Sequence, residues 1–442
     1  VPVYQMLGGK FRDRIRIYCD TDVRGKDTGL AMGQALKKRM EMGFTFLKMD
    51  VGINLLAGVE GALTAPLGFL EEMRNAVRNP STDLPDLERR RLRNRWYDLN
   101  NIAHPFTGIR ITEKGLDYLE RTQHRDGRWD ANGGQYPTAM TALGGMVLLM
   151  EGSTLREGRY SQNIRRAVDW FMDRVQPNGL LGNPNNPTES GRYMYGHGFG
   201  LLFLASAYGE EEDIERRKRL ERILTKAVEF CGKAQTDKGG WGYVSAADGN
   251  NFDEGSVTIT QLQALRAAKN AGIVVPKSII DKAVDYLKNS TTERGGVIYS
   301  LAHGGMAVSG GERPPLTAAA IACSFSAGQY DSPLAKKWLR FCRDHIGIDG
   351  RRQGHDEYLQ YYYAQAMYIL GEDRWAKLFP EEKDSTSHMT WSKYRKQMFD
   401  HILKSQASDG SWTGGYIGPH FATCVNLTIL QLENGTIPIY SR

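Results

Sequence analysis

The stretch that decides the fold is Gln235-Thr-Asp-Lys-Gly239-Gly-Trp241, a Q-x-x-x-G-x-W motif that occurs three times in the chain. The other copies are Gln123-His-Arg-Asp-Gly127-Arg-Trp129 and Gln406-Ala-Ser-Asp-Gly410-Ser-Trp412. The three tryptophans are 112 and 171 residues apart, which corresponds to two and three repeats of 56 or 57 residues. A fixed period of this length indicates a repeat architecture. Degenerate turns near residues 179, 295 and 350 complete six repeats.

Each turn lies between two kinds of predicted helix. The helix before a turn is amphipathic, as in Ile164–Val175, with apolar residues at i, i+3, i+4 and i+7. The helix after it is apolar almost all round, as in Ala139–Met150 and Val257–Ala268, and must be buried. Six pairs of outer and inner helices predict a mainly α fold, an α6/α6 toroid over residues 113–442. We expect each Trp to pack between helix pairs and each Gln to bond backbone groups at a helix end.

Composition narrows the class of protein. The chain has 442 residues, 41% hydrophobic, and a net charge of +6, which excludes a disordered chain and predicts no nucleic-acid partner. No apolar run reaches the roughly 18–20 residues of a membrane span. Five scattered cysteines favour free thiols and a reducing, cytoplasmic compartment. Because the first residue is Val1, we expect that the chain starts inside a longer product or has been processed.

The repeats resemble the QW motifs of squalene–hopene cyclases and oxidosqualene cyclases, whose toroid is shared by protein prenyltransferase β subunits. The resemblance implies isoprenoid cyclisation or isomerisation by protonation of an alkene. It implies a hydrophobic, isoprenoid-like small molecule as partner, no cofactor and no metal, and docking on a membrane surface. It leaves the oligomeric state open.

The resemblance also implies a proton donor. The hopene-type signature is D-x-D-D-T-A at the start of an inner helix, and this chain has Asn251-Phe-Asp-Glu-Gly-Ser256 at the matching place. Asp253 resembles the acid that protonates the alkene, and Glu254 the next carboxylate. Neighbouring carboxylates raise one pKa, which keeps an acid neutral until it reacts. The alternative is a capping turn, in which the acidic residues satisfy free N–H groups of the following helix.

Other inner-helix starts carry aromatic and polar residues that we expect at the same end of the toroid. Rings of aromatic side chains with a few polar groups suit a greasy, elongated ligand with one polar end. The predicted substrate-binding residues are Tyr136, Tyr195, His197, Arg313, His355, Tyr358 and His420. The alternative for each residue is helix capping or filling of the core.

Two other functions stay open for the toroid. Hopene-type cyclases have two toroids and this chain has material for one, which favours a smaller isoprenoid, a dimer, or a non-catalytic toroid that binds lipid or protein. A zinc prenyltransferase would need Asp, Cys and His in D-x-C spacing. Here Ile321 stands two residues before Cys323, and Cys424 follows His420 without a partner carboxylate nearby, so we expect no zinc site.

Residues 1–112 have no repeat character and are predicted to form an incomplete β/α segment. Strand Ile15–Tyr18, helix Ala31–Met42 and strand Phe44–Asp50 give a β-α-β order. The run Pro2–Ile15 resembles the exit from the capping domain in mandelate racemase and muconate-lactonising enzymes of the enolase superfamily. Of that family's K-x-K base motif, only Lys48 matches. This resemblance implies a remnant of a magnesium enzyme, joined to the toroid by a natural fusion or by sequence assembly.

Overall fold

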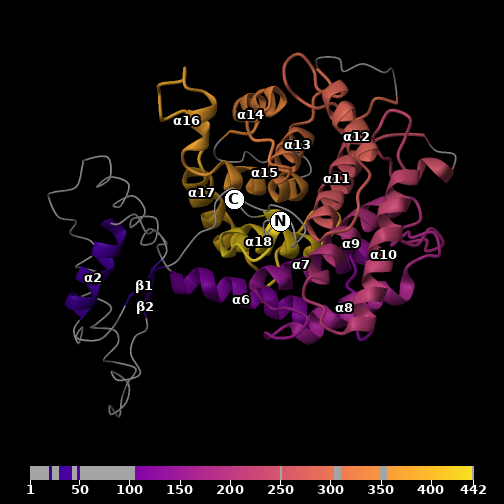
Figure 1. Ribbon diagram of the computed structural model, residues 1–442, viewed down its shortest axis with the longest axis horizontal. Coiled ribbons are helices and arrows are strands. Elements are labelled where there is room, and N and C mark those ends of the chain that lie inside the picture. The colour runs from indigo at the N-terminus through magenta and orange to yellow at the C-terminus, as the bar shows by residue number, and fades with distance from the viewer. Residues whose placement is uncertain are drawn as a thin grey trace, which may run out of the picture. The chain divides into compact units, whose positions relative to one another are not determined.

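The computed structural model describes residues 19–21, 29–41, 47–49, 105–248, 251–302, 310–347 and 356–440 (Figure 1). Contacts divide the chain into a unit of residues Arg12–Pro105 and a larger unit that contains Phe106–Arg442. The smaller unit contains strand β1 (Cys19–Thr21), helix α2 (Gly29–Glu41) and strand β2 (Leu47–Met49). β1 and β2 pair in parallel, with Asp20 opposite Lys48. The β-α-β order is therefore present; the predicted strand at residues 15–18 lies outside the described residues.

In the described part of the larger unit, six helices form a closed inner ring. Each contacts the next one along the ring, and the last contacts the first. They are α7 (Pro137–Glu151), α9 (Tyr193–Tyr208), α11 (Gly255–Asn270), α13 (Pro314–Ser326), α15 (Asp356–Leu370) and α18 (Pro419–Gln431). Most of their side chains are buried, as the all-round apolar sequences predict.

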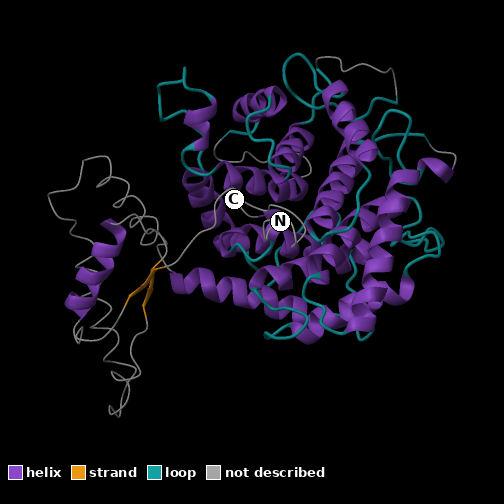
Figure 2. Ribbon diagram, viewed as in Figure 1, coloured by secondary structure: helices purple, strands orange, loops and turns teal. Residues whose placement is uncertain are grey.

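Among the described residues, six amphipathic helices pack outside this ring and bury one face each. They are α6 (Pro105–Thr122), α8 (Ser161–Arg174), α10 (Ile214–Lys233), α12 (Lys277–Asn289), α14 (Pro333–His345) and α17 (Trp391–Ser405). Short helices α16 (Arg374–Leu378), η1 (Asn132–Gly134), η2 (Ala246–Asp248), η3 (Leu432–Asn434) and η4 (Pro438–Tyr440) lie in the connections. Figure 2 shows the larger unit as helices joined by loops, which confirms the mainly helical toroid. Because α6 begins at Pro105, helical structure starts before residue 113, the predicted beginning of the toroid.

The Q-x-x-x-G-x-W turns connect neighbouring repeats. Gln235 donates from Nε2 to the Gly239 carbonyl at 2.9 Å and to the Ile279 carbonyl of the next outer helix at 3.0 Å. Trp241 is buried, and its indole N–H donates to the Cys231 carbonyl of the preceding outer helix at 2.8 Å. The other two copies repeat this arrangement, so the Gln and Trp hold helix pairs together.

A glycine is required in the turn for two reasons. Gly239 has φ +91°, a left-handed conformation that side chains disfavour. A Cβ atom built on it would also lie 2.2 Å from the Lys282 carbonyl oxygen. The degenerate turn at Gly179 has the same conformation and the same close approach, to the Lys226 carbonyl oxygen. The turn geometry therefore extends to a repeat whose sequence has lost the motif.

A second repeated contact joins each turn to the inner helix that follows. The backbone N–H at the Trp241 position donates to the Thr258 hydroxyl at 2.9 Å. Corresponding bonds run from Trp129 to Thr141, Leu181 to His197, Val297 to Thr317 and Trp412 to Thr423. In the second repeat a histidine therefore does what a threonine does in the other four.

Small side chains on α13 bring its neighbours together. Ala318, Ala319 and Ala320 are buried, and their small volume leaves room between α11 and α15. Across that space the Thr260 and Tyr362 hydroxyls lie 3.2 Å apart, and Gln263 Nε2 donates to Gln365 Oε1 at 2.7 Å. The centre of the ring thus contains polar contacts among buried aromatic residues.

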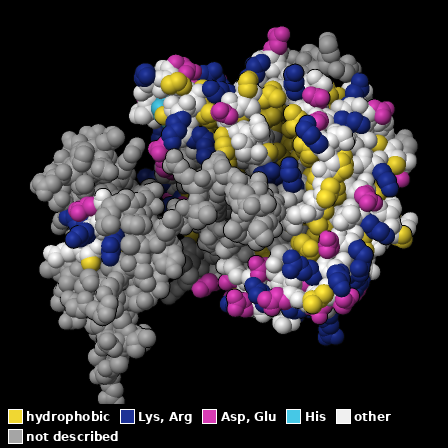
Figure 3. All heavy atoms as spheres, viewed as in Figure 1, with side chains coloured by type: hydrophobic (Ala, Val, Ile, Leu, Met, Phe, Trp, Pro, Cys, Tyr) yellow, Lys and Arg dark blue, Asp and Glu magenta, His cyan; other side chains and the backbone are white. Residues whose placement is uncertain are grey.

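The visible surface of the toroid carries scattered charges, with hydrophobic side chains gathered in a band among them (Figure 3). No helix in the described part of the chain is both long and apolar enough to cross a bilayer.

Candidate functional site at the start of α11

Backbone bonds fix the Asp253–Glu254 pair between two repeats. The Glu254 N–H donates to the Trp241 carbonyl at 2.9 Å, and the Gly255 N–H donates to the Tyr299 carbonyl at 3.0 Å. The pair therefore links one repeat turn to the next. Because the chain is extended before α11 begins, consecutive side chains point in different directions.

Asp253 faces the outer layer. It is fully buried, and its Oδ1 accepts from the Leu301 N–H at 2.7 Å, the Tyr286 hydroxyl at 2.9 Å and the Ser300 hydroxyl at 3.1 Å. Tyr286 belongs to the outer helix α12. Asp253 Oδ2 is buried without a hydrogen-bond partner among the described residues. This carboxylate holds the 299–301 segment against α12, and it does not cap α11.

Glu254 caps α11 and faces the inner helices. The side chain is 2% exposed, and its Oε2 accepts from the Val257 N–H at 2.9 Å and from the Ser256 hydroxyl at 2.5 Å. Burial raises the pKa of Glu254, and the hydrogen bonds from Ser256 and Val257 oppose that rise in part. The capping alternative thus describes Glu254 and leaves Asp253 with a different role.

Tyrosines surround the Glu254 carboxyl. The Ser256 hydroxyl is hydrogen-bonded to the Tyr195 hydroxyl of α9, so a chain of polar groups runs from Glu254 to the neighbouring inner helix. The Tyr195 ring lies 5.9 Å from the Tyr243 ring, measured between centroids. The hydroxyls of Tyr243 and Tyr299 are hydrogen-bonded to each other. Burial, and then the negative charge of Glu254, raise the pKa of Tyr195.

Tyr358 of α15 completes this group from the other side of the ring. Its ring centroid lies 4.9 Å from that of Tyr362, and its hydroxyl is buried without a hydrogen-bond partner among the described residues. Burial raises the pKa of Tyr358, and Tyr195 and Glu254 are close enough to raise it further. A buried hydroxyl without a partner is a place where a polar group of a ligand would gain a hydrogen bond.

Tyr136 lies at the rim of the same end of the ring. Its hydroxyl is 3.0 Å from that of Tyr416, which is 72% exposed. Arg192, directly before α9, places its guanidinium carbon 4.9 Å from the centroid of the Tyr243 ring. Electrostatic interactions also connect Arg192 with Tyr136, Tyr195 and Tyr416. Arg192 is not among the residues predicted from the sequence, although Tyr195 from the same inner-helix start is.

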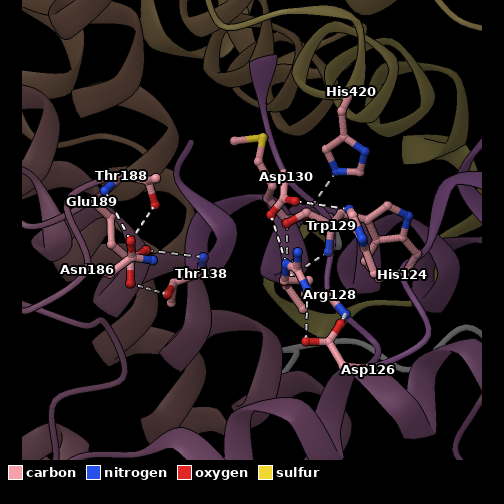
Figure 4. Close-up of polar contacts among 12 residues, drawn as sticks. His124, Asp126, Arg128, Trp129, Asp130, Thr138, Asn186, Thr188, Glu189 and His420 are labelled. Carbon is pink, nitrogen blue, oxygen red and sulfur yellow. Dashed lines mark hydrogen bonds and ion pairs between the residues drawn. The ribbon is translucent and has the colours of Figure 1, made fainter. Parts of the chain in front are cut away.

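The two predicted histidines lie away from this group. His197 is fully buried and accepts from the Leu181 N–H at 3.3 Å, with its other ring nitrogen 3.2 Å from the Ala227 carbonyl oxygen of α10. His420 is buried against Trp129 and lies 3.1 Å from the Met140 carbonyl oxygen (Figure 4). Burial lowers the pKa of each histidine to about 4. Both occupy structural positions between helices.

Of the last two predicted residues, the structure describes only Arg313. Arg313 is exposed directly before α13, where its backbone N–H donates to the Val297 carbonyl at 2.8 Å. His355 lies outside the described residues. The structure therefore brings together Glu254, Tyr195 and Tyr358. Tyr136 lies at the rim of this group, and Asp253 faces the outer helix α12.

One pair of potential zinc ligands lies close together. Cys424 Sγ lies 3.5 Å from His420 Nε2. Within the described ranges, no group of three or more His, Cys, Asp or Glu residues gathers in metal-binding geometry.

A further buried carboxylate, Glu189, has a structural role. It accepts from the Thr138 hydroxyl at 2.9 Å and from the Asn183 N–H at 2.8 Å (Figure 4).

No family model matches the sequence. Among curated proteins, a D-xylonate dehydratase of Haloferax volcanii is 29% identical over 85 residues, which is 19% of this chain and 18% of the dehydratase. The chain thus spans less than a fifth of that relative.

Solved structures match the toroid. An α-1,6-mannanase of a Salegentibacter species, 11% identical, covers 74% of this chain and 98% of its own, with a TM-score of 0.50. The type II terpene cyclase MstE from Scytonema, 14% identical, covers 75% of this chain and 99% of its own, with a TM-score of 0.46. At these identities the similarity concerns fold alone, and the fold is a mainly helical toroid.

Proposed function

We propose that the toroid cyclises or isomerises an isoprenoid by protonating an alkene, with Glu254 as the proton donor. The observation that carries this proposal is the position of Glu254, a buried carboxyl that faces the inner helices among Tyr195, Tyr243 and Tyr358. The D-x-D-D-T-A resemblance favours Asp253 as the donor. We assign the role to its neighbour because Asp253 is turned toward α12.

The chemistry requires an acid that is neutral before it reacts. Burial raises the pKa of Glu254 and so shifts this carboxyl toward its protonated form. The carboxyl O–H bond breaks as its proton forms a C–H bond with one alkene carbon, and the other carbon becomes a cation. Attack by a second alkene within the same chain forms a ring, and loss of a proton to a base ends the reaction.

Tyrosine rings suit the carbocations that follow. An aromatic face attracts a nearby cation through its quadrupole, and the attraction strengthens in a water-excluded site. Tyr195, Tyr243 and Tyr358 supply faces without a strong nucleophile, because burial raises the pKa of each hydroxyl and keeps it neutral. The unpartnered Tyr358 hydroxyl is one candidate for positioning the base or a water that removes the final proton.

Asp253 has a positioning role in this proposal. Two of its three hydrogen bonds hold the 299–301 segment, and the third joins the carboxylate to Tyr286 of α12. The Tyr299 carbonyl in turn accepts from the N–H of Gly255, next to Glu254. Loss of the Asp253 carboxylate would leave the Tyr286 hydroxyl and the Leu301 N–H without their partner. We therefore expect its replacement to reduce activity through disorder of the site.

The test is product formation by the purified full chain. The chain and its Glu254→Gln and Asp253→Asn variants are incubated with squalene and with linear isoprenoids of increasing length, and the extracts are run on gas chromatography–mass spectrometry. Glu189→Gln is the matched control, because Glu189 is also a buried glutamate whose side chain accepts from backbone at an inner-helix start. Cyclic or isomerised products from the chain and from Glu189→Gln, but not from Glu254→Gln, would support the proposal.

Other results would assign other functions. Full activity in Glu254→Gln with none in a folded Asp253→Asn would return the acid to Asp253. Retention of unchanged isoprenoid by the folded protein would support a non-catalytic binding toroid. Release of sugar from an α-1,6-mannan oligosaccharide, included because a mannanase shares the fold, would replace the isoprenoid proposal altogether.

A further inference from the structure

The rim of the toroid carries one positive charge in an aromatic surrounding. The Arg192 guanidinium lies over the Tyr243 ring at 4.9 Å and interacts with the Tyr136 hydroxyl. Tyr195 and Tyr416 are also within electrostatic reach of it. Arg192 is exposed, so its charge is available to a molecule that enters from this end.

The neighbouring hydroxyls add hydrogen-bonding capacity to that charge. Tyr136 and Tyr416 come from the starts of α7 and of α18, and their hydroxyls are 3.0 Å apart. Whichever hydroxyl accepts the bond between them keeps its own proton free to donate to a ligand. A guanidinium presents up to five N–H donors in a plane, which matches the paired oxygens of a carboxylate or phosphate.

Arg192 and Glu254 belong to one site. Arg192 is close enough to Glu254 that its charge lowers the pKa of that carboxyl. The Tyr243 ring, over which Arg192 lies, has its centroid 5.9 Å from that of the tilted Tyr195 ring. The Tyr195 hydroxyl is hydrogen-bonded to Ser256, which donates to Glu254. The order from rim to interior is therefore a cation, then tyrosine rings, then a carboxylic acid.

We infer that the ligand of this site is an isoprenoid with an anionic oxygen group, a phosphate or a carboxylate, at one end, and that Arg192 binds that group at the rim. The inference rests on the proposed function for the isoprenoid part. The anionic group would stay near water while the hydrocarbon chain enters past Tyr195 toward Glu254. A bound anion would also offset the charge of Arg192 and so favour the protonated form of the acid.

The experiment measures binding and does not depend on turnover. Isothermal titration calorimetry with the full-length Glu254→Gln chain compares farnesyl phosphate, farnesoic acid and farnesol, which share one hydrocarbon chain. Each is then measured with Arg192→Gln added. Arg217→Gln is the matched control, because Arg217 lies over the Tyr208 ring at 5.4 Å on the outer surface.

We expect at least one anionic ligand to bind tighter than farnesol by roughly tenfold to a hundredfold, the range for a hydrogen bond to a charged group. Arg192→Gln should abolish that preference, Arg192→Lys should restore part of it, and Arg217→Gln should leave it unchanged. The arm that gains, phosphate or carboxylate, identifies the group.

Equal binding of all three ligands, an unchanged preference in Arg192→Gln, or no binding at all would overturn the inference. A melting curve of each variant shows whether it is folded. If Arg192→Gln does not fold, Arg192→Lys, which keeps the positive charge, serves in its place. Because the assay uses the Glu254→Gln chain, tight Arg192-dependent binding would stand even if Glu254 proved not to be the acid.

Discussion

Two residues that are adjacent in the sequence, Asp253 and Glu254, make different contacts and have different roles. Asp253 and Glu254 are consecutive, yet one carboxylate is bonded to an outer helix and the other caps an inner helix among tyrosines. Their burial is nearly equal, so exposure alone does not separate them. What separates them is the direction of each side chain, and this direction assigns the proposed acid.

The pH dependence of the proposed reaction follows from the state of Glu254. A proton donor must be protonated before the reaction, and burial raises its pKa above the ordinary value. Activity should therefore be highest at low pH and fall as pH rises through the raised pKa. A profile of kcat/KM against pH checks this expectation. A rate that rises with pH over the same range would contradict an acid and indicate a base.

The buried histidines predict how stability depends on pH. His197 and His420 have a folded-state pKa of about 4, below the ordinary 6.5, so the unfolded chain binds more protons between these values. Stability should thus fall as pH drops from about 6.5 toward about 4. At pH 5 each histidine should cost roughly 2 kcal/mol relative to pH 7.

The variant His197→Thr isolates one of these contributions. A threonine fills this position in four other repeats and can accept from the Leu181 N–H. Urea unfolding at pH 7 and pH 5 should show a smaller loss for His197→Thr than for the unchanged chain, by about 2 kcal/mol. An equal loss in both proteins would mean that His197 is protonated in the folded state.

At the scale of elements, the repeat turn depends on its glycine. In Gly239→Ala the new methyl group would meet the Lys282 carbonyl oxygen at 2.2 Å in a left-handed backbone. Gly272→Ala is the matched control, because Gly272 has φ +88° but open space around it. The left-handed backbone alone should cost about 1–2 kcal/mol in both variants.

Gly239→Ala should lose roughly 1–3 kcal/mol more than the control, because its methyl group overpacks the turn. Urea unfolding of the two variants measures this difference in the free energy of unfolding. Equal losses would show that the turn relaxes away from α12, and that the close approach is not what requires glycine.

The elements also show how far sequence reasoning reaches. The period of the Gln–Gly–Trp motif predicts the helix pairs, because each copy must supply the same three hydrogen bonds. The proposed site is harder to predict. That Asp253 turns outward depends on Tyr286 and Leu301, which lie in the following repeat, and a sequence pattern does not carry that contact.

Arg192 and His197 show two opposite errors of prediction from sequence. Arg192 lies in the proposed site and was not predicted, whereas His197 was predicted and lies outside the site. Arg192 was missed because a single arginine resembles a solvated surface residue, and its aromatic partner Tyr243 lies in a loop far along the sequence. His197 was selected because of its place beside Tyr195. Since helix positions two residues apart point about 200° apart, the two side chains occupy different faces of α9.

At the scale of the whole molecule, the last repeat closes the ring on the first. Gln406 Nε2 donates to the Ile111 carbonyl of α6 at 2.8 Å, although the two residues are 295 positions apart. Gln235 makes the same pair of bonds within the ring. The two glutamines make equivalent hydrogen bonds, but of the two it is Gln406 that joins the last repeat to the first.

Replacing either glutamine should therefore lower the free energy of unfolding by a similar amount, but should loosen different helices. Gln406→Ala and Gln235→Ala should each cost roughly 1–3 kcal/mol, since each loses two hydrogen bonds. Hydrogen exchange followed by mass spectrometry should show faster exchange in α6 and α17 for Gln406→Ala, and in α10 and α12 for Gln235→Ala. Faster exchange across all six repeats in both variants would contradict local closure.

The origin of one proton in the product tests whether Glu254 protonates the alkene. The full chain is incubated with a linear isoprenoid in D2O, and the product is analysed by mass spectrometry. Because a carboxylic acid exchanges its proton with solvent, we predict a product one mass unit heavier per protonated alkene, and no product from Glu254→Gln. A product without deuterium, the same product from Glu254→Gln, or an unchanged isoprenoid would contradict alkene protonation by Glu254.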